Sequence, residues 1–130
     1  MISDKDEKAE LNTEVDENEK WRRKRIQQYF EKKVSRYARQ DIDAGRLKQI
    51  YCDDGLKADF KEAFVNVEWL KSCVNKCCGG CGCNFSLVAI DIEDDVRIES
   101  DITAQRLDNS IPHYISNIIP MCINCNCSNK

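Results

Sequence analysis

The sequence predicts an α+β fold: a small domain stabilised by cysteine-bound metal and preceded by a basic amphipathic helix. Three observations lead to this fold class. The chain has 130 residues, which is enough for one compact domain and an extension. Nine of them are cysteines, and an odd number does not suit a framework of disulfide bonds. Helical periodicity early in the chain gives way to strand-like alternation between two cysteine clusters.

The cysteines indicate metal binding inside the cell. A secreted disulfide-rich domain would normally begin with a signal peptide, whereas residues 1–7 are mostly charged. In a reducing compartment the thiols remain available as metal ligands. We therefore expect an intracellular protein that is not secreted, in either the cytoplasm or the nucleus. No apolar run approaches about 18 residues, so we expect no membrane partner.

Charge is distributed in blocks, although the formal net charge is only -3. Residues 1–20 contain eight acidic and three basic residues, whereas residues 21–40 contain eight basic residues and one acidic residue. Residues 1–19 lack aromatic residues and periodicity, so we predict a disordered acidic leader, which either only solvates the protein or binds a partner. A protein that is acidic overall binds polyanions poorly, so contact with nucleic acid would need the basic block.

Residues 20–63 are expected to form a helical arm that is basic at 21–39. Trp21, Tyr29 and Tyr37 recur at multiples of four, so one face of the helix is aromatic. The other faces carry the bases, for which three alternatives stay open: they bind phosphates, they are solvated or paired with the acidic leader, or they serve as a localisation signal. The candidate nucleic-acid-binding residues are Arg22, Arg23, Lys24, Arg25, Lys32, Lys33, Arg36 and Arg39.

The segment after the basic block predicts turns and short helices. Gly45 and residues 53–55 mark turns. Residues 60–74 predict one or two helical pieces whose apolar positions form a buried stripe. Cys73 lies on that stripe, so we expect it to be a small buried thiol and not a metal ligand.

Alternating apolar residues between the cysteine clusters predict a β-hairpin and a further strand. We expect strands at residues 85–91 and 96–99, joined by a turn at 93–95. A third strand is expected at 102–107, followed by a loop at 108–112.

Two cysteine pairs predict one structural zinc site. Each pair has two intervening residues, which lets a tight turn present both thiolates to a tetrahedral ion at about 2.3 Å. Gly79 and Gly80 suit such a turn, because its backbone must curl toward the sulfurs. The predicted ligands are Cys78, Cys81, Cys122 and Cys125.

The choice among neighbouring cysteines stays open at three positions. Adjacent thiols would allow Cys77 in place of Cys78, Cys83 in place of Cys81 and Cys127 in place of Cys125. A second ion, as in binuclear cross-brace domains, would need roughly eight ligands, and Cys52 and Cys73 lie in unsuitable contexts for it.

A recognisable pattern leads into the second cysteine pair. Residues 106–110 read Arg-Leu-Asp-Asn-Ser, His113 and Asn117 follow, and residues 122–126 read Cys-Ile-Asn-Cys-Asn. This order resembles the HNH endonuclease superfamily (His-Me finger, ββα-metal), in particular the branch related to phage recombination endonucleases. The resemblance covers roughly half of the chain and implies an HNH-like zinc-binding domain over residues 64–130.

The resemblance also implies a β-hairpin, a loop and a helix folded around one catalytic divalent cation. Many family members carry an Asp-His pair whose histidine activates water, an asparagine that orients it, and a His or Asn that binds Mg²⁺. Here Gln105 and Arg106 stand at the Asp-His position. Asn117 matches the middle position, and Asn126 matches the third. Arg106 cannot accept a proton at neutral pH, but it could hold the scissile phosphate.

Other residues of this segment supply candidates for the same chemistry. His113 is the only histidine, and an imidazole pKa near about 6.5 suits the activation of water. Asp108 could bind Mg²⁺, with Asn126 or Asn109 adding a carbonyl oxygen. Alternatively, His113 is a loop histidine bonded to the backbone, and residues 108–110 are turn residues.

These observations predict a metal-dependent endonuclease that hydrolyses phosphodiester bonds in DNA, with RNA as a further substrate class. The candidate catalytic residues are His113, Asn117, Asp108 and Arg106. The expected cofactors are one structural Zn²⁺ and a catalytic Mg²⁺ or Mn²⁺. Only residues 126–130 follow the last cysteine pair, so a second copy of the chain could complete the final helix in a homodimer. The alternative is a non-catalytic zinc module that binds nucleic acid or protein.

Overall fold

The structure of the protein is a computed structural model. It describes the backbone of residues 2–52, 55–93 and 95–128, and the side chains of residues 17–50, 57–93 and 95–126. The elements in chain order are α1 (Ile2–Asp43), β1 (Lys48–Cys52), β2 (Gly55–Asp59), α2 (Val67–Cys73), β3 (Leu87–Ile92), β4 (Asp95–Ser100), β5 (Ile102–Arg106), a 3₁₀ turn (Ile115–Asn117), β6 (Ile118–Cys122) and α3 (Ile123–Ser128). The fold is therefore mixed α+β, as predicted.

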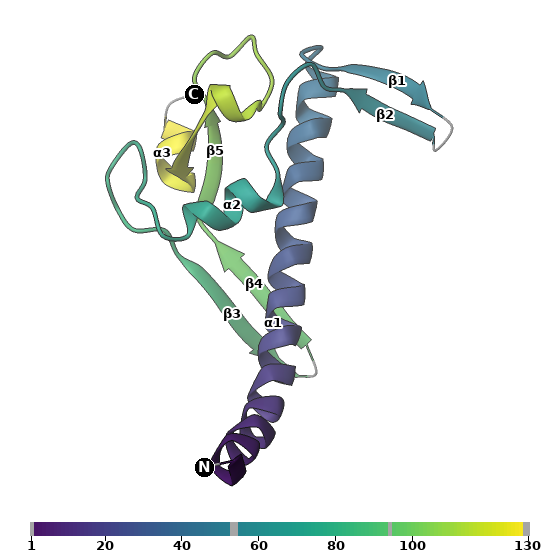
Figure 1. Cartoon of the computed structure of the whole chain (residues 1–130). Coiled ribbons are helices and arrows are strands. Elements are labelled where there is room, and N and C mark those ends of the chain that lie inside the picture. Colours follow the sequence, from purple (N-terminus) through teal and green to yellow (C-terminus); the bar gives the residue numbers. More distant parts are fainter. Residues whose placement is uncertain (1, 53–54, 94, 129–130) are drawn as a thin grey trace.

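The long helix α1 forms one side of the molecule, and α2 and the β3–β4 hairpin lie along it (Figure 1). Phe30 and Tyr37 lie two turns apart on its buried face. The helix stops because Gly45 adopts a φ of 77°, a left-handed conformation that glycine enters without a steric cost. The Gly45 amide donates to the carbonyl of Ile42 at 3.0 Å and so closes the last turn.

Residues 2–19 are helical in the structure, where the sequence predicted a disordered leader. The segment contains no glycine or proline, and five of its eighteen residues are Glu, which is a good helix former. At its end, Glu19 Oε1 lies 2.7 Å from Arg23 Nη2, an i,i+4 ion pair that links the acidic segment to the basic block. The charged residues that favour solvation of this segment are thus also compatible with its continuation of helix α1.

The helical arm predicted for residues 20–63 ends earlier, at Asp43. β1 and β2 follow as an antiparallel hairpin in which Ile50 lies opposite Lys57. This hairpin projects away from the rest of the fold (Figure 1). In β1 the apolar residues Ile50, Tyr51 and Cys52 are consecutive, so the alternation that usually identifies a strand is missing from the first half of the hairpin.

Residues 60–74, which were predicted to be helical, are helical only over α2. Asn66 begins α2 as its N-cap, with its Oδ1 accepting from Trp69 N at 2.8 Å. Before this cap the backbone pairs with a distant loop, where Val65 N donates to the carbonyl of His113 at 2.8 Å. This pairing satisfies backbone groups that a helix would otherwise satisfy, and it anchors the loop that carries His113.

The predicted hairpin and third strand are present. β3 pairs with β4, with Leu87 opposite Ser100, and β5 pairs with β6, with Ile102 opposite Cys122. The helix α3 packs against β5 and β6 and contains Cys125. β5, the following loop, β6 and α3 therefore form one ββα unit.

A single larger core joins α1, α2, β5 and β6. Its buried members are Phe30, Tyr37, Val65, Leu70, Cys73, Ile102, Ala104 and Ile118. Cys73 is fully buried, and its Sγ donates to the carbonyl of Trp69 at 3.2 Å, which agrees with the prediction of a small buried thiol. None of the helices in the described part of the chain has the length and apolar character needed to span a membrane.

Candidate functional site

Four cysteine sulfurs converge where the turn after α2 meets the junction of β6 and α3. They belong to the four predicted ligands, Cys78, Cys81, Cys122 and Cys125, and all lie within 4.8 Å of one another. The Sγ atoms of Cys81 and Cys122 are 3.9 Å apart. Two thiolates on a tetrahedral zinc ion are about 3.8 Å apart when the Zn–S bonds are about 2.3 Å long. The four cysteines can therefore hold a metal ion such as zinc.

Backbone amides surround one of these sulfurs. Gly80 N and Cys122 N each donate to Cys78 Sγ at 3.3 Å. These bonds, that of Cys122 first, lower the pKa of Cys78 to about 6, so its thiolate is available to a metal at neutral pH. Glycine at position 80 leaves room for the cluster, because a Cβ there would lie 3.1 Å from Cys125 Sγ.

The alternative ligands contribute differently. Cys77 is exposed, and its Sγ donates to Asn84 Oδ1 at 3.3 Å. Cys83 closes the turn through its carbonyl, which accepts from Cys78 N at 2.8 Å. Cys83 does not belong to the group of four converging sulfurs, and a hydrogen bond with the Cys81 thiol raises its pKa to about 12. The described residues contain no second group of potential ligands, and the side chains of Cys52 and Cys127 lie outside them.

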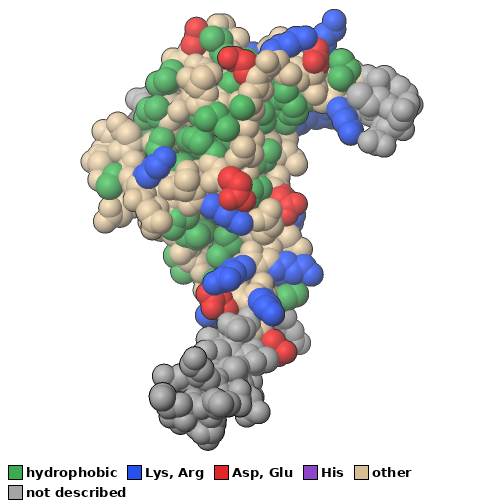
Figure 2. Space-filling model, viewed as in Figure 1, with side chains coloured by type: hydrophobic (Ala, Val, Ile, Leu, Met, Phe, Trp, Pro, Cys, Tyr) green, Lys and Arg blue, Asp and Glu red, His purple; other side chains and the backbone are tan. Residues whose placement is uncertain are grey.

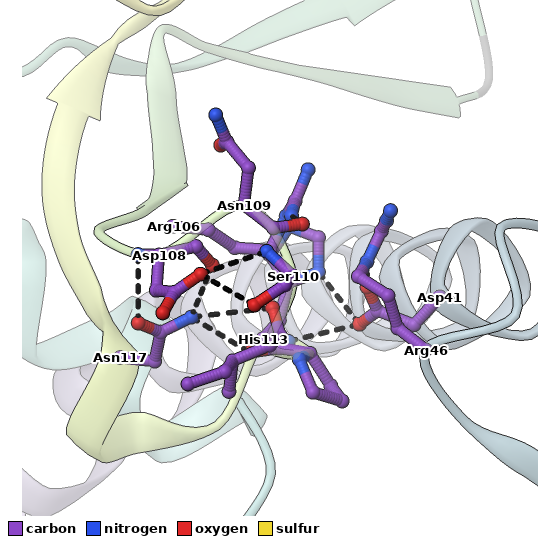
Figure 3. A network of polar contacts seen from close by, with 10 residues as sticks. Asp41, Arg46, Arg106, Asp108, Asn109, Ser110, His113 and Asn117 are labelled. Carbon is purple, nitrogen blue, oxygen red and sulfur yellow. Dashed lines mark hydrogen bonds and ion pairs between the residues drawn. The ribbon is translucent and has the colours of Figure 1, made fainter.

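The loop between β5 and β6 is held by the buried side chain of Asn117 (Figure 3). Its Nδ2 donates to the carbonyls of Asp108 at 3.0 Å and Pro112 at 3.2 Å, and its Oδ1 accepts from Asp108 N at 2.9 Å. Asp108 is exposed, and its carboxylate accepts from the hydroxyl and the amide of Ser110. These two bonds lower the pKa of Asp108. Asn117 therefore positions the loop, and Asp108 caps a turn within it.

His113 is buried and bonded to a carboxylate that comes from α1 (Figure 3). Asp41 Oδ2 accepts from the His113 backbone N at 2.9 Å and lies 2.7 Å from the ring Nδ1. Arg46 Nε donates to Asp41 Oδ1 at 2.7 Å, and Tyr37 stacks on the imidazole with 4.5 Å between ring centroids. Because a carboxylate only accepts hydrogen bonds, we assign the proton to Nδ1, which leaves Nε2 as an acceptor.

The imidazole is neutral at pH 7. Burial lowers the pKa of His113 below about 6.5, and Asp41 only partly opposes this effect. The charges of Arg106 and Arg46 lower the pKa further. A neutral imidazole with a free Nε2 can accept a proton.

His113 lines a cavity of about 440 Å³ between α1, β5 and α3. Its other lining residues are Tyr37, Gln40, Thr103, Ala104, Gln105, Arg106, Asn109 and Asn126. Two further predicted site residues, Arg106 and Asn126, thus meet His113 in one cavity, whereas Asp108 does not line it. The side-chain oxygen of Gln105 is buried without a hydrogen-bond partner, so the wall carries an unused acceptor.

Two predicted phosphate-binding arginines of α1 bind the β3–β4 hairpin. Arg25 Nη2 lies 2.6 Å from Asp95 Oδ1, and Arg22 Nη2 lies 3.7 Å from Asp91 Oδ2. Figure 2 shows the resulting surface, on which basic and acidic side chains alternate along the narrow part of the molecule. These arginines therefore stabilise the packing of α1 on the hairpin.

Three more of the predicted bases are engaged within α1. Arg23 and Arg39 form i,i+4 pairs with acids of the same helix. Lys33 is buried with its Nζ 5.5 Å from the centre of the Tyr29 ring, and burial lowers its pKa to about 8. The predicted bases that form no ion pair within the described part of the chain are Lys24, Lys32, Lys33 and Arg36, of which Lys33 is buried.

Sequence reasoning missed Asp41, Arg46 and Tyr37 as members of the site. A signal for Asp41 is present, because it follows Phe30 and Tyr37 on the apolar line of α1. A carboxylate at a core position of a helix must be paired, which points to a polar partner elsewhere in the chain.

Comparison of the chain with models of protein families, with curated proteins and with solved structures finds no match. The cysteine cluster and the His113 cavity are therefore the features from which a function can be argued.

Proposed function

We propose that the protein is a zinc-stabilised nuclease that hydrolyses phosphodiester bonds in DNA, with His113 as the general base. The observation that carries the proposal is the buried Asp41–His113 pair, in which His113 lines a cavity together with Arg106. A positioned, neutral histidine beside a fixed cation is the combination that water attack on a phosphate needs. The resemblance to HNH endonucleases supports the same reaction class.

Each residue has a defined role in this proposal. His113 Nε2 takes a proton from a water molecule, and the water oxygen attacks the phosphorus as the bond to the leaving oxygen breaks. Asp41 is a positioning residue, since it fixes the tautomer and orientation of the ring. The Arg106 guanidinium binds the phosphate and stabilises the charge that builds on its oxygens. Asn117 holds the loop that carries the base.

The cavity does not fit a magnesium ion held by the protein. The described residues that line it offer amide and hydroxyl oxygens but no carboxylate, whereas protein magnesium sites usually contain one or two carboxylates. Asn126, the predicted ligand, donates through Nδ2 to Thr103 Oγ1 at 3.0 Å. The groups that this chain supplies itself are therefore the base, its orienting carboxylate and the phosphate-binding arginine.

The cysteine cluster has a structural role in the same proposal. Zinc bound by the four thiolates would tie the turn after α2 to the end of β6 and the start of α3. Both β5 and α3 contribute walls of the cavity, so the cluster would set the position of Arg106 and Asn126 relative to His113.

Cleavage of labelled single-stranded and branched DNA by zinc-loaded protein tests the proposal, with and without Mg²⁺ or Mn²⁺. His113→Gln should lower the rate by about 10²- to 10⁴-fold with zinc content and fold unchanged. Ser110→Ala, on the same exposed loop, is the matched control and should retain most of the activity. Equal rates for the wild type and His113→Gln would remove His113 as the base. Binding without cleavage by the wild type would identify a non-catalytic module instead.

A further inference from the structure

Four residues of α1 form a continuous exposed or half-exposed line along the helix. Gln28, Lys32, Arg36 and Gln40 follow one another at intervals of four, so they lie on adjacent turns of one face. We call this line the α1 stripe. It is about 18 Å long, because the twelve residue steps from Gln28 to Gln40 each rise about 1.5 Å.

The α1 stripe connects two cavities. Its first two residues line a groove of about 390 Å³ beside β4, together with Arg25 and Arg97. Its last residue, Gln40, lines the cavity of His113 and Arg106. Lys32 and Arg36 also line a depression on α1 between these two ends, together with Glu31 and Ser35.

The chain from β4 to β5 forms the opposite wall of the same seam. Tyr29 on α1 donates through its hydroxyl to the carbonyl of Ser100 at 3.4 Å, and farther along, Ala104 N donates to the Tyr37 hydroxyl at 3.0 Å. These two bonds hold α1 against the β4–β5 chain between the groove beside β4 and the His113 cavity.

Most acidic side chains along this seam have a partner, whereas several basic side chains form no ion pair. Asp95 is paired with Arg25, and Glu99 is paired with Arg97 at 2.9 Å. Asp101 accepts from Ser86 N at 2.8 Å. Lys33 is unpaired but buried, whereas the cations that are not buried and form no ion pair within the described residues are, in order along the seam, Lys32, Arg36 and Arg106. They form a spaced row of positive charges that ends at His113.

We propose that this row binds the sugar-phosphate backbone of a single-stranded nucleic acid and leads the strand into the His113 cavity. Successive phosphates of an extended strand present a regular row of anions, which matches cations placed one helix turn apart. His113 is only 4% exposed, so a rigid duplex is too wide to approach it, and a flexible single strand is the form of nucleic acid that suits the cavity. Delivery of the strand to His113 rests on the proposed function, whereas binding of the strand by the row of cations does not.

Fluorescence anisotropy with labelled oligothymidylate and oligouridylate of about 12 nucleotides tests this inference, with a duplex of equal length for comparison. The variant Lys32→Gln/Arg36→Gln removes two cations of the row. Its logarithmic salt slope should be smaller than that of the wild type by about 1.4 units, since each contact with a single strand contributes about 0.7. The control Arg23→Gln/Arg39→Gln removes two charges of the same helix that are paired with acids of α1, and it should leave the slope unchanged.

The outcomes separate binding from chemistry. Both single strands should bind more tightly than the duplex, and a tighter oligouridylate complex would make RNA the substrate class. His113→Gln should bind the single strands as tightly as the wild type. Binding by the wild type without any cleavage would therefore count against the proposed reaction and leave the proposed binding row intact. Equal loss in the two double variants, tighter binding of the duplex, or no binding by the wild type would each overturn the row.

Discussion

Replacing Asp41 by asparagine should destabilise the folded protein by about 3 kcal/mol. The carboxylate accepts from Arg46 through Oδ1 and from both the backbone and the ring of His113 through Oδ2. Asparagine has a single oxygen, so its NH₂ group must face either the Arg46 donor or the two His113 donors. One side of the bridge between α1 and the loop is then lost, and the Arg46 charge loses its partner.

The size of this effect follows from burial. The Asp41 side chain is fully buried, and that of Arg46 is 17% exposed. Removing one partner of a buried pair typically costs about 3 to 5 kcal/mol. Because Arg46 reaches some solvent, the lower end of this range applies.

Urea unfolding at a fixed free zinc concentration measures the change. With a slope of about 2 kcal/mol per molar, the midpoint of Asp41→Asn should fall by about 1.5 M. Asp43→Asn is the matched control, because it removes the same charge only two residues farther along the helix. The Asp43 carboxylate is exposed and lies 3.8 Å from the Arg39 guanidinium. Asp43→Asn should change stability by less than about 0.5 kcal/mol. Equal midpoints for the two variants would refute the argument that Asp41 anchors the loop.

Three further predictions concern the cysteine cluster and pH. Cys78→Ser should release one zinc ion per chain and unfold the domain, whereas Cys77→Ser should keep both the zinc and the fold. Metal analysis together with circular dichroism distinguishes these outcomes. A Cys78→Ser variant that is folded but free of zinc would contradict the assignment of Cys78 as a structural zinc ligand. Gly80→Ala places a Cβ 3.1 Å from Cys125 Sγ and should weaken zinc binding by about 10- to 100-fold in a chelator competition, and unchanged affinity would show that the turn can relax. Burial lowers the pKa of His113 in the folded protein, so as the pH falls the unfolded chain protonates its imidazole first. The neutral imidazole therefore contributes fully to the stability of the fold above about pH 7. This contribution is lost as the pH falls from about 6.5 through the lower pKa of the folded state. The slope should reach at most about 1.4 kcal/mol per pH unit, and His113→Gln should lack this component when both proteins are unfolded across the same pH range.

Local patterns predicted the elements that are defined by local chemistry. The C-x2-C spacing identified all four clustered cysteines, because a tight turn brings two thiolates together whatever surrounds it. Alternating apolar residues likewise located β3, β4 and β5 to within a few residues. The β1–β2 hairpin was missed because backbone pairing defines it, and none of its side chains that the structure describes, those of residues 48–50 and 57–59, is fully buried.

Contacts between distant parts of the chain could not be predicted in the same way. His113 and Asp41 are 72 residues apart, and no spacing rule connects a loop histidine to the end of a helix. The sequence therefore left His113 as either a base or a loop residue, with no partner. For the same reason, the basic block was treated as one surface, although Arg22 and Arg25 bind the hairpin and Lys33 is buried.

Because the chain has a single histidine, the claim that His113 is a neutral general base held by Asp41 can be tested directly at its two ring nitrogens. Nitrogen-15 NMR of the zinc-loaded protein reports the tautomer and the pKa of His113 without interference, since the chain has no other imidazole. The account predicts a neutral ring at pH 7 with the proton on Nδ1, a free Nε2 and a pKa below about 6.5. A proton on Nε2, or a pKa at or above about 6.5, would contradict the assignment of His113 as a general base held by Asp41.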